Sequence, residues 1–266
     1  IKGGTYRVQQ KYPQTGKEDE FVLNLYDTNR SNGTAKMTVT GGTFANFNPA
    51  NCQAEGANTN FCAEGYSTKQ EDENYTVMGP VAAIGEHNYA TLSAAVEAAD
   101  NKTVTLLKDV TEDLVIPADK TVTLDLNSNK LTNKTNHTIL NNGTLTITGT
   151  GTVDNVTHQK AALYNKGTAT LEGGTFDRTK ENGKTKAQSG NNSWYTIKNV
   201  GTMTVKDGVT VQTAGNNNSL GKFSSLVSNG YFNNSDFTNN KGIDNPNLTI
   251  EGGNFLGGLN TIKNDD

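Results

Sequence analysis

The chain has 266 residues, of which 33% are hydrophobic and 19% charged, and threonine, asparagine and glycine contribute 38, 36 and 28 of them. Threonine favours strands whereas asparagine and glycine favour turns, so this composition predicts an all-β fold of many short strands and excludes a helical bundle. The net charge is −4, so the chain lacks the excess of positive charge that nucleic-acid binding requires, and we expect no nucleic-acid partner. No stretch approaches the roughly 20 apolar residues of a membrane span, so we expect no membrane insertion.

The first predicted elements are strands that end in a glycine pair. Met37–Phe44 alternates apolar and polar residues before a Gly-Gly-Thr-Phe corner, and Ile1–Tyr6 ends in the similar corner Gly-Gly-Thr-Tyr. Alternation with a period of two predicts a strand with one buried face. The glycine pair predicts a turn that needs positive φ or a close backbone approach.

Two cysteines follow, Cys52 and Cys62, in a loop rich in glycine and asparagine. They form no CxxC motif and have no neighbouring histidine, so we expect no metal site. We predict a local disulfide between them, which would fit an extracytoplasmic location, with a pair of loop thiols as the alternative.

The next stretch predicts the end of one domain and the start of another. Phe61–Tyr66 and Tyr75–Val77 are expected to form a hairpin, and Gly79-Pro80 marks a boundary. Tyr89–Ala99 has the pattern of a short amphipathic helix with Thr91 as a plausible N-cap. We therefore expect residues 1–80 to be the final coils and hairpin cap of one β-solenoid. Residues 81–266 are then a second β-helix that begins with a capping helix near residues 90–100.

Strands predicted at 103–107, 114–116 and 122–126 lead into a clear internal repeat. Copies of the alternating pattern begin at Leu145, Ala169, Met203 and Leu248, and the shortest distance between equivalent strands is 24 residues. That distance suits one turn of a three-sided, right-handed parallel β-helix, in which equivalent residues stack at about 4.8 Å.

A second element precedes these strands and carries an asparagine, as in Ile139-Leu-Asn141 and Leu163-Tyr-Asn165. Stacked coils would align these residues in one column, where each amide can bond the next coil. The expected column has a structural role and comprises Asn24, Asn141, Asn165, Asn199 and Asn229.

These residues carry a resemblance to a known group of proteins. The Gly-Gly-Thr-Phe repeats, with Phe61–Tyr66, Tyr75–Val77, Tyr89–Val96 and Val104–Asp109, resemble adhesin-like surface or secreted proteins of gut bacteria, within the pectate-lyase-like solenoid superfamily. The resemblance implies a right-handed β-helix and an extracellular or cell-surface location. It does not imply a particular activity.

Function is open between three classes. Asp125, Asp154, Asp177 and Asp207 fall in different phases of the repeat and the polygalacturonase motifs are missing, so we expect no enzyme and no cofactor, with a β-helix polysaccharide lyase or hydrolase as an alternative. The main prediction is a non-enzymatic structural or adhesive repeat protein that forms a rigid stalk or fibre unit.

A long polar insertion suggests a binding site in addition. It contains Trp194 and Tyr195 beside Asn192, and an exposed aromatic plate beside polar groups suits glycan recognition, so a glycan-binding adhesin module is the other alternative. The partners that we expect are host or cell-wall glycans and copies of the chain itself. Copies are expected because Asn260–Asp266 leads, by the repeat, into a segment like Ile1–Tyr6.

Overall fold

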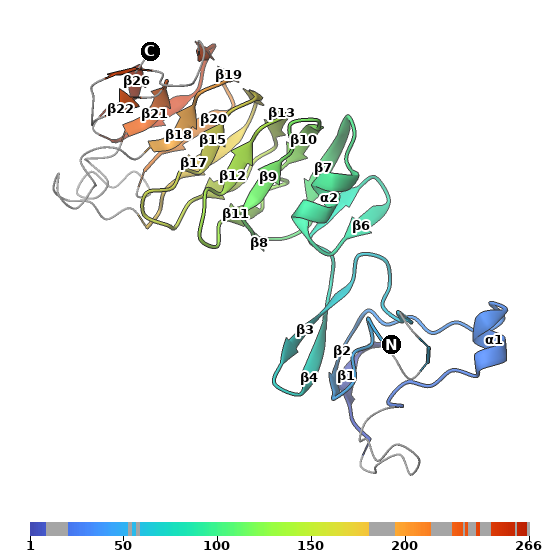
Figure 1. Cartoon of the computed structure of the whole chain (residues 1–266). Helices are drawn as coiled ribbons and strands as arrows, with labels where there is room; N and C mark the ends of the chain where they lie inside the picture. The colour runs from blue at the N-terminus through green and yellow to red at the C-terminus, as the bar shows by residue number, and fades with distance from the viewer. Residues whose placement is uncertain are drawn as a thin grey trace. The chain divides into compact units, whose positions relative to one another are not determined.

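The computed structural model describes residues 1–8, 21–52, 55–56, 59–180, 195–213, 225–230, 232–233, 238–239, 246–258 and 260–264. The chain divides into two compact units. One comprises Ile1–Val81 and Glu86–Thr91, and the other comprises Ala82–Gly85 and Leu92–Asp266. Both consist mainly of strands, so the chain belongs to the all-β class (Figure 1). No helix in the described part of the chain has the length and apolar character needed to cross a membrane.

The first unit contains a sheet with the strand order β1-β2-β4-β3. The bounds of these strands are β1 Lys2–Tyr6, β2 Gly41–Ala45, β4 Asn74–Met78 and β3 Ser67–Glu71. The two Gly-Gly-Thr-aromatic corners lie side by side, because β1 and β2 are parallel with Tyr6 opposite Phe44. The two rings stack with their centroids 4.8 Å apart.

The hairpin of this unit differs from its prediction in one strand. It pairs β3 with β4, so the first strand is Ser67–Glu71 and not Phe61–Tyr66. Phe61 is instead buried, and its neighbour Cys62 forms an isolated parallel bridge with Val39. The apolar contact of Phe61 therefore draws this stretch into the core and leaves the more polar 67–71 to form the hairpin.

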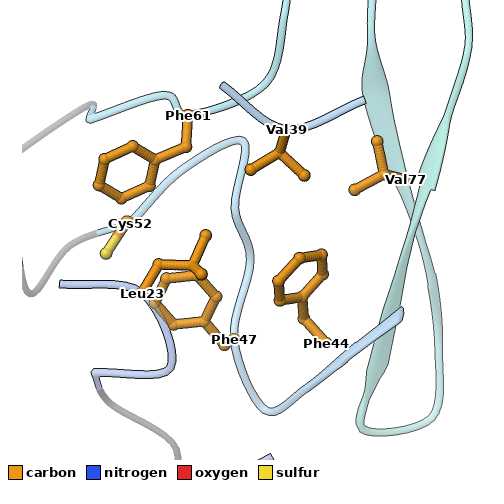
Figure 2. Packing of buried hydrophobic residues seen from close by; sticks show 7 residues of the cluster. All are labelled: Leu23, Val39, Phe44, Phe47, Cys52, Phe61 and Val77. Atoms are coloured by element: carbon orange, nitrogen blue, oxygen red, sulfur yellow. The ribbon is translucent and has the colours of Figure 1, made fainter. Parts of the chain in front are cut away.

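The core of the first unit is a small cluster of buried side chains (Figure 2). It contains three phenylalanines, of which Phe44 and Phe47 have ring centroids 6.1 Å apart. The full cluster is Leu23, Val39, Phe44, Phe47, Cys52, Phe61 and Val77. The remaining elements of the unit are α1 (Asp27–Ser31) and β6 (His87–Tyr89).

In the second unit the chain passes through three sheets in turn, so that every third strand belongs to the same sheet, apart from one short pair of strands that lies outside them (Figure 1). The parallel strands of the first sheet are β7 (Lys102–Leu106), β10 (Thr121–Asp125), β13 (Thr144–Thr148), β16 (Thr168–Leu171), β19 (Thr202–Val205) and β24 (Asn247–Ile250), and β5 (Ala82–Ile84) joins this sheet antiparallel to β7. The second sheet holds β8 (Val110–Thr111), β11 (Lys130–Thr132), β14 (Thr152–Asp154), β17 (Gly174–Asp177), β20 (Val209–Gln212) and β25 (Asn254–Leu256). The third sheet holds β9 (Leu114–Ile116), β12 (Ile139–Asn141), β15 (Leu163–Asn165), β18 (Tyr195–Asn199), β21 (Ser225–Asn229) and β26 (Ile262–Asn264). Two short strands, β22 (Phe232–Asn233) and β23 (Thr238–Asn239), pair with each other.

The register of these sheets places equivalent residues of successive repeats opposite one another. Leu145 pairs with Ala169, which pairs with Met203, which pairs with Leu248, as the repeat predicts. Leu145, Ala169 and Met203 are at most 1% exposed. Burial of each large apolar side chain of this kind contributes about 1.5–3 kcal/mol, so contacts between neighbouring repeats hold this unit together.

A short helix covers the strands at which the stack begins. α2 (Leu92–Ala98) packs against β7, β9 and β5 (Ala82–Ile84), and it buries Leu92, Ala95 and Val96. The Glu112 carboxylate accepts hydrogen bonds from the backbone N–H groups of Leu92 (3.0 Å) and Ser93 (2.9 Å). A helix N-terminus leaves such groups without partners inside the helix. A side chain about twenty positions further along the chain therefore satisfies part of this helix end.

Candidate functional site

The predicted asparagine column is a continuous chain of side-chain hydrogen bonds in the third sheet. Asn141 donates to Asn165, Asn165 to Asn199 and Asn199 to Asn229, each over 2.7 Å. Asn229 then donates over 2.9 Å to Asn264, a member that the prediction did not include. Each amide nitrogen from Asn141 to Asn199 also donates to a backbone carbonyl of the following repeat.

Asn24 is not part of this column. It belongs to the first unit and is exposed, so its prediction as a fifth member is wrong. The position in the third sheet that precedes Asn141 is occupied by Ile116. The column therefore begins only at the second repeat.

The expectation that the aspartates stay apart is also wrong for one pair. Asp154 and Asp177 are opposite each other on β14 and β17, and both are buried. Asp154 forms a salt bridge with Lys130 Nζ at 2.6 Å and accepts a hydrogen bond from the Thr179 hydroxyl at 2.6 Å. Asp177 accepts a hydrogen bond from Gln212 Nε2 at 2.7 Å. These bonds tie one repeat to the next, which is a structural use of the two carboxylates.

The cysteines are not joined in the structure. Cys52 and Cys62 are both present as thiols, Cys52 buried and Cys62 partly so, and the predicted disulfide is not formed. Cys52 instead pairs with Thr59 in an antiparallel bridge, while Cys62 pairs with Val39 in a parallel one. Within the described ranges, no group of three or more His, Cys, Asp or Glu is placed to hold a metal ion.

Cys62 should react slowly with thiol reagents. Burial raises its pKa to about 11, because the thiolate loses hydration, whereas a free cysteine has a pKa near 8.5. At pH 7.5 we expect alkylation of Cys62 by iodoacetamide to be about a hundredfold slower in the folded protein than in urea, measured by mass spectrometry of the peptide. Equal rates would contradict this environment, and an intact mass lower by two hydrogen atoms would show the disulfide.

Only part of the predicted ligand-binding trio can be placed. Trp194 and Asn192 lie outside the described residues. Tyr195 begins β18 and is half-buried, with the Lys263 ammonium 6.0 Å from the centre of its ring. Tyr195 also lines a pocket that the sequence did not reveal.

This pocket has a volume of about 240 Å³. It lies along the third sheet, and the residues that line it are His137, Gln159, Lys160, Ala161, Tyr164, Tyr195 and Lys198. The pocket is therefore built from three successive repeats.

Tyr164 is the aromatic centre of the pocket. It lies opposite Lys198 on the neighbouring strand, and the Lys198 ammonium is 5.4 Å from the centre of the ring. The Lys166 ammonium lies 5.1 Å from the same centre. The negative face of an aromatic ring attracts cations, so the ring holds two ammonium groups close together.

His137 adds a neutral hydrogen-bond donor. Its Nδ1 accepts the backbone N–H of Ala161 at 2.9 Å, and its ring meets Tyr164 edge-on with centroids 5.0 Å apart. Because Nδ1 is an acceptor here, the remaining proton is on Nε2. Burial, together with the positive charges of Lys160, Lys198 and Lys166, lowers the pKa of His137 to about 4.

The stability of the protein should fall in mild acid because of this residue. The folded state keeps His137 neutral down to about pH 4, whereas the unfolded chain takes up the proton near pH 6.5. Between these values the unfolded state binds more protons, so the free energy of unfolding decreases as the pH falls from 6.5 to 4 and is constant above 6.5. We expect a loss of about 1 kcal/mol after solvent screening of this half-buried ring, measured by urea unfolding. The His137→Gln variant should lose this part of the slope, and a variant of exposed His158, His158→Gln, should keep it.

A simple signal in the sequence would have revealed the lysine and tyrosine of the pocket. Each column asparagine is preceded by a residue on the opposite face of its strand, and these residues are Leu140, Tyr164, Lys198, Ser228 and Lys263. Alignment on the asparagines therefore brings Tyr164 and Lys198 together.

Searches against protein-family models, curated proteins and solved structures found no match for the chain.

Proposed function

We propose that the chain is a non-enzymatic, extracellular bacterial repeat protein with a structural or adhesive role, built as a right-handed parallel β-helix. The support is the passage of the chain through three sheets in turn, together with the resemblance of its Gly-Gly-Thr-Phe corners to those of adhesin-like proteins. The buried pair Asp154 and Asp177 favours this proposal over a hydrolase, because hydrogen bonds inside the stack occupy these carboxylates.

One observation carries the proposal: the asparagine column continues without a break from Asn141 to Asn264. A repeat of this kind buries its apolar face only against its neighbours, so the stack behaves as a stiff one-dimensional rod. A rod that holds binding loops away from a cell surface, present in several copies, gains avidity without new contacts. This is the physical advantage of such a stalk for adhesion.

Electron microscopy of the untagged protein tests the stalk. We expect elongated particles, and fibres with a regular axial repeat would support the addition of copies end to end. Compact round particles would contradict the proposal.

The pocket around Tyr164 favours a second function, the glycan-binding module. Sugar rings commonly stack on aromatic side chains beside polar donors, and here Tyr164 and Tyr195 lie with Lys198 and His137. A volume of about 240 Å³ is below the usual range of pockets for drug-sized ligands and suits a single sugar residue.

A pair of variants tests this second function. Tyr164→Ala should abolish retention on immobilised bacterial and host glycans, whereas Tyr164→Phe, which keeps the ring, should retain most of it. Their thermal unfolding midpoints should be compared, so that loss of binding is distinguished from loss of folding. Equal retention of wild type and Tyr164→Ala would contradict a site at this ring.

A further inference from the structure

The donors of the pocket limit the chemistry of what it can hold. Lys160 and Lys198 carry ammonium groups, which only donate hydrogen bonds, and His137 presents a donor at Nε2 because its Nδ1 is already an acceptor. A neutral sugar offers hydroxyl groups that must both donate and accept. A carboxylate or sulfate offers only acceptor oxygens, so it matches these three donors better, whereas Gln159 and the two tyrosine hydroxyls can both donate and accept.

The charges near the pocket also favour an anionic ligand. The ring of Tyr164 keeps the ammonium groups of Lys166 and Lys198 within 5.4 Å of its centre. Further along the same sheet, Lys263 lies over Tyr195. Burial is the main cause of the lowered pKa of His137, and the positive charges of Lys160, Lys198 and Lys166 lower it in addition. A net-negative chain thus concentrates positive charge at one aromatic pocket.

We propose that this pocket binds an anionic sugar residue, with its carboxylate or sulfate between the ammonium groups of Lys160 and Lys198 and its ring against Tyr164 and Tyr195. The inference rests on the glycan-binding function proposed above and specifies its ligand.

The test measures binding to three immobilised polysaccharides of similar length: one with uronate residues, one with sulfated residues and one that is neutral. Wild type should bind at least one acidic polymer and not the neutral one, and binding should weaken as salt is raised. Lys198→Met keeps the apolar stem and removes the charge, and it should lower affinity for the acidic polymer about tenfold. The control Lys102→Met removes an exposed lysine on the first sheet, outside the pocket, and should leave affinity unchanged within about twofold.

The possible outcomes separate the inference from the function on which it rests. Binding to the uronate polymer alone or the sulfated polymer alone supports the inference and identifies the anion. Equal binding to the neutral polymer, lost in Tyr164→Ala, overturns the anionic ligand and leaves the glycan site. Binding to none of the three overturns both. An equal loss in Lys102→Met and Lys198→Met would reveal general charge attraction and would overturn the site.

A second readout reports directly on the pocket. An anion beside Lys160 and Lys198 offsets their field, so the pKa of His137, followed by NMR titration, should rise from its value of about 4 when the acidic polymer is bound. Tyr164, Lys166 and the backbone N–H of Ala161 also face this ring. An unchanged His137 pKa at saturating ligand would place the anion elsewhere and overturn the proposal.

Discussion

Replacing Gly167 with alanine is expected to prevent the second unit from folding into its present stack. A Cβ at this position would lie 2.1 Å from the carbonyl oxygen of Gly143 in the preceding repeat. Gly201 has the same relation to Gly167, with 2.2 Å between the added Cβ and the oxygen, so the close approach recurs along the stack. Backbone atoms that are themselves hydrogen-bonded to the next repeat cannot move aside without opening the sheets. We expect a loss of more than about 4 kcal/mol in the free energy of unfolding, measured by urea denaturation.

Gly3 provides the matched control for this substitution. A Cβ added to Gly3 meets no atom within 4 Å, so Gly3→Ala should change stability by less than about 1 kcal/mol. If Gly167→Ala unfolds at the same urea concentration as the wild type, the repeats are not packed as closely as the structure has them. Far-UV circular dichroism of the variant would distinguish an unfolded second unit from a stack with altered register.

The Asn165→Ala variant should lose about 3 kcal/mol of stability. Asn165 is fully buried; it accepts a hydrogen bond from Asn141 and donates to the side chain of Asn199 and to the carbonyl of Thr202. Its removal leaves buried donors and acceptors in two neighbouring repeats without partners, at a cost of about 1–3 kcal/mol for each such group, part of which local rearrangement recovers. Urea denaturation followed by circular dichroism measures this loss.

Two further variants show whether hydrogen bonding is the cause. Asn165→Asp has nearly the same shape but places a carboxylate oxygen opposite the Asn199 oxygen, so its loss at neutral pH should be at least as large. Asn247→Ala removes an exposed amide at the start of β24 and should cost less than about 0.5 kcal/mol. A small effect of Asn165→Ala, similar to that of Asn247→Ala, would mean that the column is not a principal source of stability.

Both the glycines and the asparagines could be recognised in the sequence for the same reason. In a stack of similar repeats each position meets its own equivalent, so a residue type that suits one contact recurs at that position. The apolar positions from Leu145 to Leu248 follow the same rule, and their predicted register is confirmed by the pairing of β13, β16, β19 and β24. The helix at 92–98 also lies within the stretch where its apolar period predicts it.

Contacts between unlike residues could not be derived in this way. The Glu112 carboxylate at the start of α2, and the aspartate pair Asp154 and Asp177, join positions whose separation in sequence depends on the length of the intervening turns. The hairpin strand at 67–71 could not be foreseen from local sequence either, because the burial of Phe61 in the core of the first unit is a tertiary contact.

The sequence by itself determined the all-β class, the repeat and its buried columns, because each follows from a local pattern that neighbouring copies reinforce. Alignment of the repeats on their asparagines pairs Tyr164 with Lys198, but only the tertiary structure decided the pocket as a whole, because His137, Gln159 and Lys160 lie in loops outside the strands that the repeat aligns. Their proximity depends on the register of the strands in the third sheet. In this register Asn141 lies opposite Asn165, 24 positions further along the chain, and Asn165 lies opposite Asn199, another 34 positions along. A surface feature of this kind has no periodic signature of its own, since it differs in each repeat.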